Sequence, residues 1–109
     1  MASIADGVRL LDEGRYEEAL RTFLEAEVDP DDQTALSYYL GLAYTNLERY
    51  DEAVLYLEQV VSSDGDFSHI YQGRMLLGYI YTVTWRYRLA EFEFSRLLED
   101  GFDSAKVHA

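Results

Sequence analysis

The stretch LGLAYTNLERYDEA, from Leu40 to Ala53, decides the fold because its pattern occurs three times in the chain. DGVRLLDEGRYEEA comes before it and LGYIYTVTWRYRLA comes after it. The steps between corresponding residues are 34 and then 37 positions. A period near 34 is the length of one helix–turn–helix unit in a solenoid. The recurring residues are Gly7, Gly41 and Gly78, then Tyr16, Tyr50 and Tyr87, and then Ala19, Ala53 and Ala90.

Apolar residues follow helical spacing inside each unit. In TALSYYLGLAYTNL, residues 34–47, they recur every three or four positions without the alternation of a β-strand. The polar stretches VDPDDQ and SSDGDFS carry Pro, Gly, Asp and Ser, which favour turns. Asp51 is a suitable N-cap for the fourth helix. The sequence predicts six helices, over residues 2–13, 17–28, 34–47, 51–62, 70–83 and 87–99.

The recurring Gly and Ala indicate a close crossing of the two helices in each unit. Gly inside a helix costs about 1 kcal/mol relative to Ala. Since the chain bears this cost at the same place in all three units, a larger side chain there would push the helices apart. We expect the recurring Tyr, which always follows an Arg, to cover the core at the turn. The Arg residues are Arg15, Arg49 and Arg86.

The pattern resembles the tetratricopeptide repeat, whose signature is aromatic-x-x-Leu-Gly-x-x-Tyr in the first helix and Ala-x-x-x-Phe in the second. The central unit has Leu40-Gly41-x-x-Tyr44 and Ala53-x-x-x-Leu57, and the third has Leu77-Gly78-x-x-Tyr81 and Ala90-x-x-x-Phe94. The first unit is weaker at its start but has Ala19-x-x-x-Phe23. The usual Trp of the first helix is replaced by Ser3, Ser37 and Arg74.

The resemblance implies an all-α solenoid of three units, coiled into a right-handed superhelix. We expect repeats over residues 1–33, 34–67 and 71–103, with residues 104–109 as a tail that could begin a further helix. The longer second step implies three inserted residues around Phe67 to Ile70. Three stacked units are close to the minimum for a stable array.

In proteins that this sequence resembles, the first helices line a groove that holds a peptide or a helix. Co-chaperone members hold a terminal carboxylate there with Lys, Asn and Arg. This chain has Ile4, Val8, Gln72 and Leu76 at those places, so a carboxylate clamp is not expected. The resemblance places groove residues at Val8, Asp12, Tyr38, Leu42, Thr45, Asn46, Met75, Tyr79 and Thr82, and also at Ile4, Leu11 and Val83.

The second and third of those helices are nearly free of charge: residues 34–47 carry none, and residues 71–84 carry only Arg74. An apolar, Tyr-rich groove suits an amphipathic helix or an extended apolar peptide. The sequence therefore predicts a non-catalytic adaptor or scaffold that binds a protein or peptide partner. The alternative is that several of these side chains are core, since solenoids bury much of each helix.

The third unit suggests a second class of function. TWRYRLAEFEFSRLL is more apolar than one helix needs against a single neighbour, whereas solenoids normally end in a helix with a polar outer face. Either the chain continues into a longer array, with Asp103 or Ser104 capping the next helix, or this end pairs with another copy as a homo-oligomer. The candidate self-association residues are Trp85, Leu89, Phe92 and Leu98.

The net charge of −12 is unevenly spread. Residues 1–33 carry ten acids and three Arg, residues 34–70 carry six acids and one Arg, and residues 71–109 carry five of each sign. This acidic field disfavours nucleic acid and anionic membranes as partners. It favours either a basic partner or a solvated face that keeps the protein soluble.

Nothing in the sequence predicts an active site, a metal or a cofactor. There is no Cys, and no nucleophile, phosphate-loop or calcium-loop motif occurs. His69 and His108 lack a partner at ligand spacing and are expected to be solvated. No apolar run is long enough to cross a bilayer. The N-terminus lacks the pattern of a signal peptide, so we expect a cytoplasmic protein.

Overall fold

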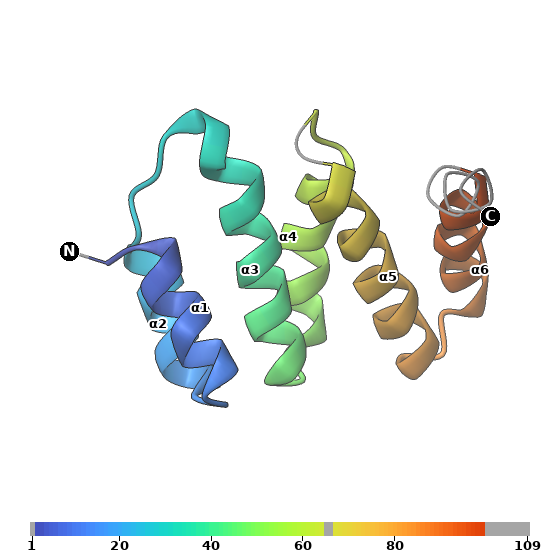
Figure 1. Cartoon of the computed structure of the whole chain (residues 1–109). Helices are drawn as coiled ribbons and strands as arrows, with labels where there is room; N and C mark the ends of the chain where they lie inside the picture. Colours follow the sequence, from blue (N-terminus) through green and yellow to red (C-terminus); the bar gives the residue numbers. More distant parts are fainter. Residues whose placement is uncertain (1, 65–66, 100–109) are drawn as a thin grey trace.

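The computed structural model describes residues 2–64 and 67–99, which form a row of paired helices (Figure 1). No strand occurs in this part of the chain, so the prediction of an all-α fold is confirmed. The helices are α1 (Ile4–Asp12), α2 (Tyr16–Glu25), a short 3₁₀ turn η1 (Pro30–Asp32), α3 (Gln33–Asn46), α4 (Tyr50–Val61), α5 (Phe67–Val83) and α6 (Tyr87–Leu97).

Each helix packs mainly on its neighbours along the chain. The most extensive pairings are α3 with α4, α5 with α6 and α4 with α5, and α1 with α2 follows closely. In addition, α3 contacts both α1 and α5, so the three first helices lie side by side. Figure 1 shows them as one layer, with α2 and α4 behind it. Local pairing of this kind is the architecture of a helical repeat array.

The crossings inside each pair confirm the interpretation of the glycines. A Cβ added to Gly41 would lie 2.6 Å from Leu57 Cδ2, and one added to Gly78 would lie 2.5 Å from Phe94 Cε1. A Cβ on Gly7 would overlap the ring of Phe23 in the same way. The recurring alanines are buried at these crossings. Gly and Ala therefore set how closely the two helices of a pair approach.

The first helix of each pair ends in the same way. Gly14, Glu48 and Trp85 have positive φ angles of 77°, 59° and 67°. The N–H of the following Arg donates to a carbonyl five residues back, as in the bond from Arg49 N to Tyr44 O at 2.9 Å. These are the bonds of a Schellman motif, in which Gly is the usual left-handed residue. Only the first pair uses Gly there.

Several predicted helix ends are wrong by one to three residues. The second helices start at Tyr16 and Tyr50, one residue early, with Arg15 and Arg49 at the N-cap. Asp51 is therefore not the cap; it lies in the first turn, where its charge still favours the helix dipole. The second helix ends at Glu25 instead of residue 28, since Ala26 is already extended; Pro30 keeps the residue before it extended as well.

The prediction of three inserted residues around Phe67 to Ile70 agrees with the length of α5, which has 17 residues where α3 has 14. Phe67 precedes Gly78 by the same distance in sequence as Pro30 precedes Gly41. In contrast, α4 has 12 residues where α2 has 10, although both start at the recurring Tyr. Counted together with η1, α3 is as long as α5, and the extra length then begins at the end of α4; the place of the insertion stays a prediction. The predicted cap at Asp103 or Ser104 lies outside the described residues.

Candidate peptide-binding face

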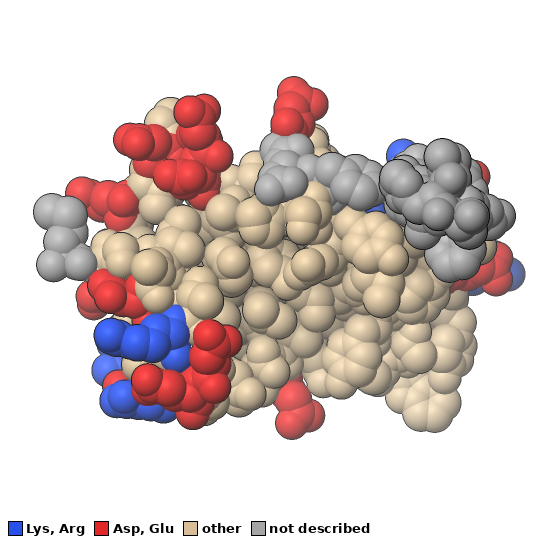
Figure 2. Space-filling model, in the orientation of Figure 1, with Lys and Arg blue, Asp and Glu red and all other residues tan. Residues whose placement is uncertain are grey.

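The layer of α1, α3 and α5 presents a face with little charge at its centre. Figure 2 shows Asp and Glu along its upper and lower edges and mixed charges over the α1–α2 end, while the area over α3 and α5 lacks them. Since α3 carries no charged residue, this follows directly from its sequence. The centre of the face is thus available for apolar and hydrogen-bonded contacts.

An open depression of about 560 Å³ lies between α3 and α5, next to the start of α4. Its apolar walls come from Leu42, Tyr50, Leu76 and Tyr79. Thr45, Asn46 and Glu48 complete its lining. Four of the predicted groove residues are thereby brought together in one place: Leu42, Thr45, Asn46 and Tyr79.

Two polar side chains of the depression are held by their own helix, α3. Thr45 Oγ1 donates to the Gly41 carbonyl at 2.7 Å, and Asn46 Nδ2 donates to the Leu42 carbonyl at 3.0 Å. The phenols of Tyr50 and Tyr79 lie near one another. Burial and the neighbouring Tyr79 phenol raise the pKa of Tyr50 above its ordinary value. The Tyr50 phenol therefore stays neutral at physiological pH.

Tyr38 differs from the other predicted groove residues because it is buried, with only 7% of its surface exposed. Its hydroxyl donates to Gln72 Oε1 of α5 at 2.7 Å. The ring lies 5.3 Å from that of His69, which also contacts Tyr39. The prediction of a solvated His69 in a loop is therefore wrong, since it lies in the first turn of α5 against two rings. The predicted tail His108 lies outside the described residues.

The remaining predicted groove residues lie outside the lining of the depression. Asp12, Met75 and Thr82 are exposed, and Val8 is partly buried against the core. Thr82 Oγ1 donates to the Gly78 carbonyl at 2.8 Å, the same bond that Thr45 makes in the preceding pair. These residues share the layer of first helices with the depression but do not form its walls.

Glu48, Tyr50 and Leu76 line the depression but were not predicted as site residues. Tyr50 is one of the recurring tyrosines, for which the sequence predicts only a position that covers the core. Glu48 lies in the turn between α3 and α4, so its place depends on how that turn folds back. The recurrence of Tyr after each turn was the one signal that could have pointed to this part of the site.

A family model described as tetratricopeptide repeat matches residues 10–75. The match covers more than half of the chain, and it agrees with the paired helices and the close Gly–Ala crossings.

The chain belongs to the tetratricopeptide repeat family.

Tetratricopeptide repeats are typically non-catalytic modules for protein–protein interaction. The match ends inside α5, and the α5–α6 pair continues the same arrangement beyond it. Searches of curated proteins and of solved structures gave no match.

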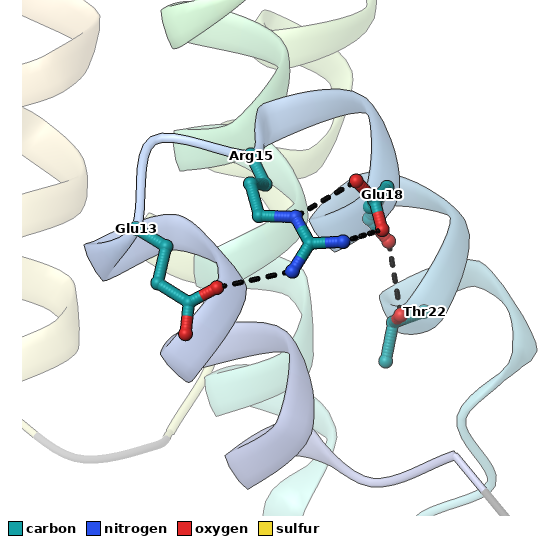
Figure 3. Close-up of polar contacts among 4 residues, drawn as sticks. All are labelled: Glu13, Arg15, Glu18 and Thr22. Carbon is teal, nitrogen blue, oxygen red and sulfur yellow. Dashed lines mark hydrogen bonds and ion pairs between the residues drawn. The ribbon is translucent and has the colours of Figure 1, made fainter.

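The turns of the first two repeats are tied by ion pairs on their recurring Arg. Arg15 contacts both Glu18, three residues on, and Glu13, as Figure 3 shows. Arg49 binds Glu52 at 2.8 Å, which lowers the pKa of that carboxyl. In the third repeat, Leu89 replaces this Glu, and Arg86 lies 4.0 Å from Asp51 of the preceding repeat. All of these groups are largely exposed, so each pair contributes little to stability.

The third tetratricopeptide repeat holds an ion pair inside its own helix crossing. Arg74 Nη1 lies 3.3 Å from Glu93 Oε1, with 13% and 10% of the two side chains exposed. Burial raises the pKa of Glu93, and the positive charge of Arg74 partly opposes this. The pair joins α5 to α6 and is not part of the open face. Sequence spacing could not predict it, since the two residues belong to different helices.

The outer face of the third repeat is largely uncovered in the described part of the chain. Trp85 is 79% exposed and Phe92 is 54% exposed, and Tyr87, Leu89 and Leu98 are each about half exposed. All four residues predicted for self-association therefore lie at the surface. The indole of Trp85 makes an edge contact with the ring of Tyr87, with centroids 6.2 Å apart.

Within residues 2–64 and 67–99, no group of three or more Asp, Glu or His side chains is arranged to hold a metal ion. A search of the same residues found no helix whose length and hydropathy would let it cross a bilayer.

Proposed function

We propose that this tetratricopeptide repeat protein is an adaptor that holds a short apolar or amphipathic segment of a partner protein between α3 and α5. The observation that carries the proposal is the open depression with Leu42, Tyr50, Leu76 and Tyr79 as its walls. Aromatic and aliphatic walls with a few hydrogen-bonding groups are typical of sites that anchor one side chain of a peptide.

Charge favours a partner segment with basic residues beside its apolar anchor. Glu48 lines the depression, and the whole chain carries a net charge of −12. Lys or Arg next to the anchor would therefore speed association and orient the segment. An acidic segment would be repelled by the same field.

The test begins with a random peptide display library selected on the full chain. We expect selected peptides to share an apolar or aromatic anchor and to be enriched in Lys and Arg. Fluorescence anisotropy then compares one labelled peptide on the wild type and on Tyr79→Ala. Because Tyr79 is a half-exposed wall of the depression, we expect binding to weaken at least about tenfold without unfolding.

A matched control is Leu55→Ala, which removes another exposed apolar side chain, on α4 and outside the lining of the depression. It should leave the affinity unchanged. Tyr79→Phe keeps the ring and removes the hydroxyl beside Tyr50, so it separates the contribution of the ring from that of the hydroxyl. Peptides that bind Tyr79→Ala as tightly as the wild type would overturn the proposal.

A second function, assembly through the third repeat, is supported by the exposed Trp85, Leu89, Phe92 and Leu98. Monomeric proteins seldom expose so many large apolar side chains in one region unless they form a contact. Light scattering coupled to size-exclusion chromatography would compare the wild type with Phe92→Glu. A wild-type assembly that becomes monomeric in the variant would support this function, with Leu55→Glu as the control. A wild-type monomer at high concentration would overturn it.

A further inference from the structure

The outer ridge of α6 consists of residues that cannot contact α5. Ala90, Glu93 and Leu97 are buried and mark the inner side of the helix. On the opposite side, the exposed residues are Arg88, Phe92, Ser95 and Glu99. These four residues are four, three and four positions apart. This is the spacing that places side chains along one line where two helices pack lengthwise. Leu98 and Glu99 come directly after the last residue of α6.

Along this helix, positions equally distant from the two ends of the segment carry charges of opposite sign. The segment is RLAEFEFSRLLE, from Arg88 to Glu99. Counted inwards from its two ends, Arg88 matches Glu99 and Leu89 matches Leu98. Phe92 matches Ser95, a large side chain against a small one. A segment with this pattern is complementary to a second copy of itself running in the opposite direction.

We propose that the chain forms a two-fold dimer in which α6 of one copy packs antiparallel on α6 of the other. The proposal rests on the assembly function proposed above and specifies its geometry. Arg88 of each copy faces Glu99 of the other, and each Phe92 packs over Ser95. The two-fold axis repeats every contact, so one complementary pattern provides two ion pairs and two apolar contacts.

Electrostatics favours a second copy at this surface over contact through the other repeats. Residues 71–109 have no net charge, whereas residues 1–33 carry −7, so two copies meet with least repulsion through the third repeat. A head-to-tail contact would instead place the outer ridge of α6 against α1 of the next copy. The exposed residues of α1 include Ala5, Arg9 and Asp12, which offer little apolar area.

The contact of one helix pair is small for a stable interface, so we expect a dissociation constant on the order of 10 µM. Sedimentation equilibrium on the full chain, over a concentration range spanning that value, would measure it. Arg88→Glu and Glu99→Arg each place like charges opposite one another twice, and each should weaken the dimer at least about tenfold. The double variant exchanges the two charges and should recover most of the affinity.

The design separates specific pairing from general charge repulsion. Glu99→Arg makes the net charge less negative and should still weaken the dimer, whereas the double variant has the wild-type net charge. Arg21→Glu, an exposed change of the same kind on α2, should have no effect.

A wild-type monomer throughout would overturn both this proposal and assembly through the third repeat. A dimer that Phe92→Glu disrupts, but in which the double variant fails to rescue the single variants, would overturn only the antiparallel register.

Discussion

Glu48 and Trp85 occupy left-handed backbone positions that the first repeat fills with Gly14. A side chain with a Cβ is strained there by roughly 1–2 kcal/mol. The Schellman bonds hold these residues in place despite the strain, as the bond from Arg86 N to Tyr81 O at 2.7 Å illustrates. The chain thus keeps one turn geometry in all three repeats while varying the residue at its most demanding position.

This strain predicts that Glu48→Gly stabilises the protein. The gain from an unstrained turn should exceed the added entropy of the unfolded chain by about 0.5–1 kcal/mol. Urea unfolding followed by circular dichroism would measure the difference. Glu48→Ala removes the same carboxylate but keeps a Cβ, so it should not give this gain. Equal stability of the two variants would show that the effect comes from charge and not from the backbone.

At the scale of elements, the Arg74–Glu93 pair joins α5 to α6 in a largely buried contact. A buried carboxylate is costly without its partner, since desolvation favours the protonated form. The pKa of Glu93 is raised by burial even in the presence of Arg74. This group therefore supports folding most strongly in acid, and its contribution is lost as the pH rises through its folded-state pKa.

Arg74→Met should consequently destabilise the protein by about 2–3 kcal/mol at neutral pH. Without the guanidinium the pKa of Glu93 rises further, so the deficit relative to the wild type should shrink as the solution is acidified towards the ordinary pKa of glutamate. Urea titrations at several pH values would follow this difference. In Arg74→Met/Glu93→Leu the deficit should be smaller and independent of pH. A deficit of Arg74→Met that stays constant with pH would refute the assignment.

For the whole molecule, the uneven net charge of −12 sets the response to salt. Exposed ion pairs such as Arg15–Glu18 lose strength in salt, but each is worth no more than about 1 kcal/mol. Repulsion among the excess acids of the first two repeats acts throughout the array and is screened as well. We expect repulsion to be the larger effect.

The melting temperature should therefore rise as NaCl is increased from about 20 mM to about 300 mM, which shortens the screening length severalfold. Differential scanning calorimetry at neutral pH would record the shift. Near the sequence pI of about 4.3, where the net charge vanishes, the same addition should have little effect. A melting temperature that falls with salt at neutral pH would mean that the ion pairs dominate.

The sequence by itself determined the helical repeats and the family. The recurring Gly, Tyr and Ala lie at contacts within one helix pair, such as Gly41 against Leu57. Because such contacts join residues that are close in sequence, the spacing of residues predicts them. The sequence also predicted four residues that line the depression. This was possible because the first helices lie in one layer, so that corresponding positions of each repeat face the same side. Helix ends were less predictable, since caps and turns decide them.

Only the tertiary structure decided which of these corresponding positions are exposed to solvent. Tyr38 and Met75 hold corresponding places in the second and third repeats, yet Tyr38 is 7% exposed and Met75 is 46% exposed. Tyr38 is covered because α5 brings Gln72 and His69 against it. The pairing of Arg74 with Glu93 likewise depends on a contact between helices. Burial in a repeat array is set by the neighbouring repeat, and the sequence of a single repeat does not contain that neighbour.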